Sequence, residues 1–181
     1  MINKWPCTIE QGDDSGWTPL HIAAHLGNDK IVKNILDKKK SSAYEKNKEG
    51  LSALHIAAKE GNVLVMKEFI TACPDIYELL DNTGRTALHV AAERGQQEAV
   101  SFFLERPDLA GLINEQDEEG NTPMHLAAIR GYYKVLLLLA HRQDVDINAT
   151  NKEGLTTMDK NVSSTKIGMH LKVCPFCPAE C

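Results

Sequence analysis

The tetrapeptide Thr18-Pro19-Leu20-His21 decides the fold, because the chain repeats it at a nearly constant spacing. The later copies are Ser52-Ala53-Leu54-His55, Thr86-Ala87-Leu88-His89 and Thr122-Pro123-Met124-His125. Successive copies begin 34, 34 and 36 residues apart. A fifth copy, Thr156-Thr157-Met158-Asp159, begins 34 residues later and has Asp in place of His. A period in the low thirties, kept over the whole chain, predicts a stack of repeated helical hairpins.

Every unit carries the same local signals in the same order. A polar turn, here called the tip, ends in a Gly that can adopt positive φ, and a Thr or Ser two residues later can cap a helix. That first helix contains an Ala pair, such as Ala57-Ala58, and ends at a second Gly. A second helix follows, with apolar pairs such as Ile31-Val32 and Leu64-Val65 about one turn before the next pair. Asn28 and Asn62 are the expected caps of this second helix.

The repeated Thr-Pro-Leu-His pattern, followed by Ala, resembles the signature of the ankyrin-repeat family. The resemblance covers residues 13–159 and implies an all-α solenoid of four full repeats and a partial fifth, starting near residues 14, 48, 82, 118 and 152. A segment 1–12 precedes the repeats. A divergent, Cys-containing tail of residues 160–181 follows them and is expected to be poorly ordered.

Two loops refine the resemblance. Cys73-Pro74-Asp75 and Asn114-Glu115-Gln116-Asp117 are similar to inter-repeat loops of plant ankyrin-repeat proteins of the accelerated-cell-death type. Those relatives usually carry more repeats and then a multi-helix membrane region. The resemblance therefore implies a truncated or alternatively terminated member of that group.

Composition narrows the class of protein. The chain has 181 residues, of which 43% are hydrophobic and 25% charged, and a formal net charge of −5. These values exclude a wholly disordered or collagen-like chain, and the acidic balance gives no general attraction to nucleic acid. The longest strongly apolar run, Val135 to Ala140, is far shorter than the about 20 residues of a membrane span. The start lacks the apolar core of a secretory signal, so a cytoplasmic location with reduced cysteines is expected.

Four of the seven histidines occupy one repeat position, three residues after the capping Thr or Ser. An imidazole there can bond the cap hydroxyl and nearby turn carbonyls, joining one repeat to the next. Catalysis rarely needs the same group once per unit, so the histidines are interpreted as structural. The sequence contains no nucleophile elbow and no phosphate-binding glycine motif. We therefore expect no enzyme activity, no small-molecule substrate and no cofactor.

The tail holds the only metal-like spacing in the sequence. His170, Cys174, Cys177 and Cys181 offer one imidazole and three thiols, a set that can bind zinc tetrahedrally. The alternative is a non-homologous tail without a selected function. The shortness of the segment, its two prolines and the terminal position of Cys181 favour that alternative.

The family resemblance implies a binding surface for other proteins on the concave side, formed by the tips and the exposed ends of the first helices. The candidate partner-binding residues are Trp17, His25, Leu26, Leu51, Arg85, Arg94, Glu118, Glu119 and Arg130. Trp17 and Leu51 occupy equivalent tip positions, so with Leu26 they could form an exposed apolar hot spot. Alternatively, Trp17 folds over the first unit and caps its core. His25 is interpreted either as a partner contact or as a solvated side chain.

The charged candidates also have two interpretations. Glu118 and Glu119 lie with Glu115 and Asp117 at the fourth tip, and three arginines, Arg85, Arg94 and Arg130, are expected nearby. Together they form either a solvated face of mixed charge or an acidic tip that steers a basic peptide.

Three functions follow from these observations. The first is a non-enzymatic adaptor for other proteins, which the resemblance places in plant defence or stress signalling. The second is a zinc-dependent regulator that acts through the tail. The third is a soluble competitor of membrane-anchored relatives. Self-association is also expected through the C-terminal end of the stack, where Tyr132, Tyr133 and the run Leu136 to Leu139 precede an incomplete fifth unit.

Overall fold

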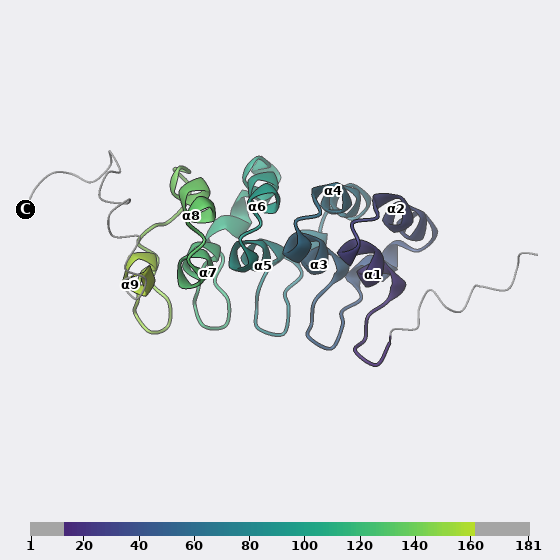
Figure 1. Ribbon diagram of the computed structural model, residues 1–181, viewed down its shortest axis with the longest axis horizontal. Helices are drawn as coiled ribbons and strands as arrows, with labels where there is room; N and C mark the ends of the chain where they lie inside the picture. The colour runs from purple at the N-terminus through teal and green to yellow at the C-terminus, as the bar shows by residue number, and fades with distance from the viewer. Residues whose placement is uncertain (1–12, 162–181) are drawn as a thin grey trace, which may run out of the picture.

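The computed structural model describes residues 13–161 of the chain, and within this range the helices form two rows (Figure 1). The inner row contains α1 (Pro19–His25), α3 (Ala53–Glu60), α5 (Ala87–Arg94), α7 (Pro123–Arg130) and α9 (Thr157–Asn161). The outer row contains α2 (Asp29–Lys38), α4 (Val63–Ala72), α6 (Gln97–Leu104) and α8 (Tyr133–Ala140). Short 3₁₀ helices η1 (Lys40–Tyr44), η2 (Ile76–Glu78) and η3 (Pro107–Asn114) lead from an outer helix toward the next tip.

The predicted all-α solenoid is confirmed. Each inner helix packs against its outer partner and against the inner helix of the next unit, and the tips extend from the inner row along one edge (Figure 1). Among residues 13–161 the only β-pairing consists of two isolated bridges, Lys46 with Ser52 and Thr150 with Thr156. Units are numbered here from 1 to 5 by their tips at residues 13–16, 47–50, 81–84, 117–120 and 151–154.

The inner helices start where the sequence predicts. Thr18, Ser52, Thr86 and Thr122 each accept a hydrogen bond from the backbone N–H of the histidine three residues later. The same histidine ring accepts one from the N–H of the capping residue, which completes a reciprocal capping box. Pro19 and Pro123 fall in the first turn, where a missing N–H has no partner to lose.

The core runs along the stack between the two rows. The Ala pairs of α3 and α5 are fully buried, because small side chains let neighbouring inner helices approach closely. Phe69 of α4 and Phe103 of α6 fill the space between inner and outer helices. The predicted pair Leu64-Val65 is shifted by one residue, since Leu64 is 63% exposed and the buried pair is Val65-Met66. The buried stripe of α4 therefore starts one residue later than the sequence suggested.

Glycine is required at the tips by both conformation and space. Gly50 has a φ of +79°, and a Cβ at this residue would lie 2.4 Å from the backbone nitrogen of Asn82 in the next tip. Adjacent tips are also joined by backbone bonds. Lys48 donates its N–H to Ser15 at 3.1 Å, and Glu118 donates to Thr83 at 3.0 Å. At Gly50 the neighbouring tip therefore leaves no room for a side chain.

Asn62 differs from its predicted role. Asn28 does cap α2, through a 3.0 Å bond from the N–H of Ile31, but Asn62 makes no such bond to α4. Its amide instead donates to the carbonyls of Ala24 and His25 in the preceding unit, at 2.8 and 3.1 Å. The carbonyls at a helix C-terminus lack intrahelical partners, so Asn62 satisfies those at the end of α1 rather than capping its own helix.

The C-terminal end of the stack exposes part of its apolar surface. Leu136 and Leu139 of α8 are buried, whereas Tyr132, Tyr133 and Leu137 are exposed. In the part of the chain that the structure describes, no helix combines the length and the apolar character needed to cross a membrane.

Candidate protein-binding face

The repeated histidines hold the units together. The Nε2 atom of each ring lies at hydrogen-bond distance from a backbone carbonyl at the tip of the next unit. The pairs are His21 with Leu51 at 3.0 Å, His55 with Arg85 at 3.0 Å, His89 with Asn121 at 3.1 Å and His125 with Leu155 at 3.2 Å. Because Nδ1 accepts from the capping residue, Nε2 carries the proton and donates. Both ring nitrogens of each imidazole are therefore engaged, which confirms the structural interpretation.

Burial keeps the rings of His21, His55 and His89 neutral. Desolvation lowers the pKa of His21 and His55 and lowers the pKa of His89 to about 4. The rings lie in successive units rather than around a common pocket. In unit 5, Asp159 accepts the bonds from the N–H and hydroxyl of Thr156, at 2.9 and 2.7 Å, so the cap survives where the histidine is replaced.

The first residue of each tip is also structural. The Oδ1 atom of Asp117 accepts bonds from the N–H groups of Glu119 and Asn121, at 2.9 and 2.8 Å. Equivalent bonds are made by Asp13, Asn47, Asp81 and Asn151. The Asp117 side chain is only 1% exposed, so it does not belong to a solvated acidic cluster. Glu118 and Glu119 are exposed, as expected for a surface that a partner can reach.

The expected Trp17–Leu51 patch does not form, because Leu51 is buried. Leu51 is 7% exposed and belongs to the core, and its carbonyl receives the His21 bond. Trp17 is half-buried and packs against His21 and, edge to face, against His25, with ring centroids 5.7 Å apart. Leu26 is 72% exposed. The apolar part of the inner face at unit 1 therefore consists of Trp17 and Leu26, without Leu51.

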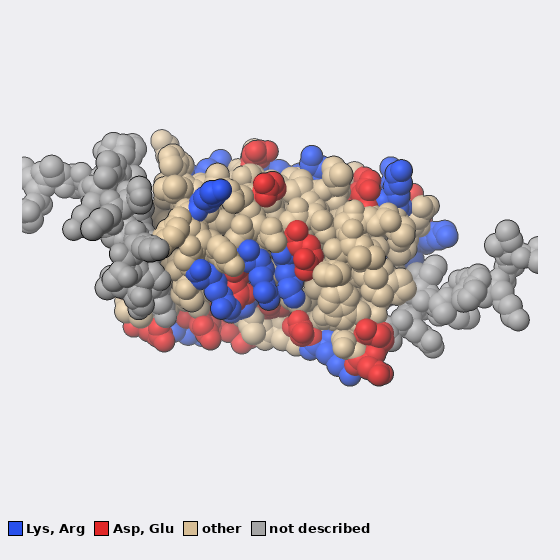
Figure 2. Space-filling view, in the orientation of Figure 1, with Lys and Arg blue, Asp and Glu red and all other residues tan. Residues whose placement is uncertain are grey.

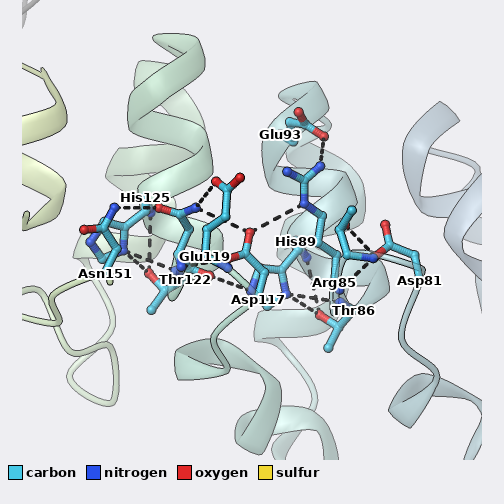
Figure 3. A network of polar contacts seen from close by, with 12 residues as sticks. Asp81, Arg85, Thr86, His89, Glu93, Asp117, Glu119, Thr122, His125 and Asn151 are labelled. Carbon is cyan, nitrogen blue, oxygen red and sulfur yellow. Dashed lines mark hydrogen bonds and ion pairs between the residues drawn. The ribbon is translucent and has the colours of Figure 1, made fainter. Parts of the chain in front are cut away.

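A polar network covers the inner face at units 3 to 5 (Figure 3). Arg85 lies between two carboxylates, with Nη1 3.1 Å from Glu93 Oε2 and Nε 3.5 Å from Asp117 Oδ2. Glu93 also forms an ion pair with Arg130, which raises the pKa of that guanidinium. The amide of Asn121 donates to Glu119 at 3.1 Å, and its oxygen accepts from Asn151 at 3.0 Å. The network thus links three successive units through their side chains.

The structure brings Arg85 and Arg130 together through Glu93, which the sequence analysis did not single out. The Glu93 side chain is only 12% exposed beneath the two guanidinium groups. Arg94, at the end of α5, is exposed. Comparison of charges between neighbouring units would have identified Glu93, since Glu93 and Arg130 are opposite charges that occupy adjacent repeat positions 37 residues apart.

Metal ligands are not assembled on this face. Within residues 13–161, no group of three or more His, Cys, Asp or Glu side chains is placed to hold a metal ion. The candidate zinc ligands His170, Cys174, Cys177 and Cys181 lie outside the described residues, so the zinc hypothesis stays a prediction.

The fold and this face define a solenoid of helical hairpins with an exposed inner surface. The family pattern described as ankyrin repeats, in three copies, matches residues 2–76 and 65–151. The chain therefore belongs to the ankyrin-repeat family. Ankyrin repeats are generally protein–protein interaction modules and are typically not enzymes. No curated protein matches the sequence.

Proposed function

We propose that the chain is an adaptor that binds a protein partner on its inner face, defined as the tips together with the exposed ends of α1, α3, α5 and α7. The observation that carries the proposal is the difference between buried and exposed repeat positions. The capping and histidine positions are the same or nearly the same in units 1 to 4 and are buried. The two residues before the second glycine form a different pair in every unit: His25-Leu26, Lys59-Glu60, Glu93-Arg94 and Ile129-Arg130. Because the fold does not dictate these side chains, they are free to recognise a partner.

Trp17 and Leu26 form the apolar anchor of this face. Tryptophan is enriched among residues that dominate binding energy, especially where part of the ring is already packed and part stays accessible. Trp17 meets this description, since it is half-buried against His25. The exposed Leu26 side chain extends the apolar area at the same unit. A partner that places an apolar side chain here removes both from water.

Affinity capture with the intact chain, compared with Trp17→Ala, tests the proposal. We expect the variant to bind the captured partner about 30-fold more weakly, which corresponds to about 2 kcal/mol. The melting temperature should change little. Leu137→Ser, at an exposed site on the outer helix α8, is the matched control and should leave binding unchanged. Equal losses of binding and melting temperature for Trp17→Ala would assign Trp17 to capping the first unit and would contradict the anchor.

The finer assignments remain predictions. A cytoplasmic setting, a role in plant defence or stress signalling, and competition with membrane-anchored relatives are supported by sequence resemblance or composition alone. Self-association has one further support, which is the exposure of Tyr133 and Leu137 at the C-terminal end of the stack.

A further inference from the structure

The residues at the ends of neighbouring inner helices meet in a regular way. The residue two before the second glycine of one unit pairs with the residue just before that glycine in the next unit. His25 Nδ1 lies 3.2 Å from Glu60 Oε1, which joins units 1 and 2. Glu93 and Arg130 form the equivalent ion pair between units 3 and 4. The solenoid repeat therefore places these two positions side by side at each step.

The pair between units 2 and 3 breaks the pattern. The same two positions are occupied there by Lys59 and Arg94, so both members carry a positive charge. Throughout residues 13–161, no carboxylate lies within 4.0 Å of either cation. Glu60, next to Lys59 in the sequence, is paired with His25, and Glu93, next to Arg94, is held by Arg85 and Arg130. The local carboxylates are thus already engaged, and the two cations have no anion between them.

The helix dipole does not account for this pair. A single cation near a helix C-terminus is favoured by the helix dipole, which accounts for Lys59 on α3 or Arg94 on α5 taken separately. However, the carbonyl of Lys59 already accepts a 2.8 Å bond from the Gln96 amide. Two like charges at adjacent positions also repel each other.

The distribution of charge over the surface is consistent with a positive area around Lys59 and Arg94. Lys and Arg side chains gather over the middle of the inner row, with a few Asp and Glu side chains beside and between them, and Asp and Glu side chains predominate along the edge where the tips are (Figure 2). The chain as a whole carries a net charge of −5, so this local positive area does not simply follow the overall charge. A partner that approaches the middle of the inner face therefore meets several cations.

We propose that Lys59 and Arg94 bind a carboxylate of an acidic segment of the protein partner. This inference rests on the proposed function, because it names the chemistry of the partner at the same face. The planar guanidinium matches a carboxylate with two parallel hydrogen bonds, and the Lys59 ammonium adds a second positive charge. The bound carboxylate supplies the anion that the other two inter-unit pairs already contain.

The geometry also predicts a spacing in the partner. Packed helices lie about 8 to 10 Å apart, so the midpoint between α3 and α5 is about 12 to 15 Å from α1. An extended chain advances about 3.3 Å per residue, so this distance corresponds to about four residues. The partner segment therefore carries an apolar residue, for Trp17 and Leu26, about four residues from an Asp or Glu.

Selection of random 12-residue peptides displayed on phage, with the intact chain as bait, tests this proposal. We expect the enriched peptides to contain Asp or Glu about four residues from an apolar residue. Arg94→Glu and Lys59→Glu should each weaken an enriched peptide at least tenfold. The binding should also weaken as salt is raised, because the contact is electrostatic. Lys134→Glu, an exposed charge reversal on the outer helix α8, is the matched control and should have no effect.

The failure of this inference can be told apart from the failure of the proposed function. Enriched peptides without acidic residues, or peptides that bind Arg94→Glu as well as the unmodified chain, would overturn the acidic-segment proposal. If those peptides still lose binding with Trp17→Ala, the inner face remains the binding site. Peptides insensitive to both Trp17→Ala and Arg94→Glu would overturn both proposals.

Discussion

The histidine row and the exposed row of this protein share one period but follow different rules. The histidine row consists of the caps and histidines typified by Thr86 and His89, and its residues are buried in every unit from 1 to 4. The exposed row consists of the two residues before each second glycine, most of which are exposed, as Leu26 and Arg94 are, while Lys59 is half-buried. Neighbours on all sides fix the identity of a buried histidine, whereas a side chain in the exposed row has solvent on one side. In this solenoid, the residues that repeat from unit to unit hold the stack together. The residues that change from unit to unit form the surface that a partner can contact.

The largest expected effect comes from removing a member of the histidine row. His89→Ala leaves the Thr86 N–H and the Asn121 carbonyl without a partner in a buried site and also opens a cavity. We expect the free energy of unfolding to fall by about 4 kcal/mol. Urea unfolding followed by circular dichroism measures the change.

Asp159→Ala is the matched control for His89→Ala, because Asp159 occupies the same repeat position but is exposed and bonds only its own cap. The expected loss is about 1 kcal/mol. Equal losses for the two variants would mean that the bridge to the next unit contributes nothing, and the contrast between the two rows would lose its basis.

Lowering the pH should reduce the stability that the buried histidine row contributes to the fold. Burial lowers the pKa of His21 and His55, and that of His89 to about 4, whereas an unfolded histidine has a pKa of about 6.5. Between these values the unfolded chain binds protons that the folded chain does not. The stability that the neutral histidines contribute is therefore complete above about pH 6.5 and is lost as the pH falls toward 4. His89 alone accounts for about 3 kcal/mol of this free energy of unfolding.

Urea unfolding at about pH 7.5 and about pH 5 measures the acid effect, with the pH range of the unfolded histidine in between. His89→Gln, which cannot be protonated, should show a smaller difference between the two conditions than the unmodified chain. A free energy of unfolding that does not change over this range would contradict the assignment of buried, neutral imidazoles.

The smallest expected effect on stability comes from charge reversals in the exposed row, and the test is whether each reversal stabilises or destabilises the fold. Arg94→Glu places a carboxylate beside Lys59 and replaces a like-charged pair with an attractive one. We expect a stabilisation of no more than about 0.5 kcal/mol, because exposed ion pairs contribute little. Arg130→Glu, at the same position one unit later, places a carboxylate beside Glu93 and should destabilise instead. Melting temperatures that shift in the same direction for both variants would contradict the alternation of charges along this row.

Sequence reasoning succeeded where one residue reports its own surroundings. The caps, the second glycines and the histidine bridges depend on local geometry that recurs with the period, so Thr18 and His21 were assigned correctly. It was wrong at Leu51, because exposure was inferred from equivalence with Trp17, while the core at unit 2 extends to the tip. It was wrong at Asn62, because a side chain after a helix can reach the preceding unit as easily as its own helix.

The amino-acid sequence by itself determined the stack. A Gly with positive φ, a capping hydroxyl and a buried imidazole each have one good solution, and their order along the chain fixes the hairpin and its neighbour. Only the tertiary structure decided which charges meet. Glu93 finds Arg130 across 37 residues, and Lys59 and Arg94 occupy the equivalent positions without a carboxylate beside them, because the packing of neighbouring helices sets those distances. The sequence around a long surface side chain does not indicate which residue it will contact, so its partner can be identified only when the helices are placed side by side.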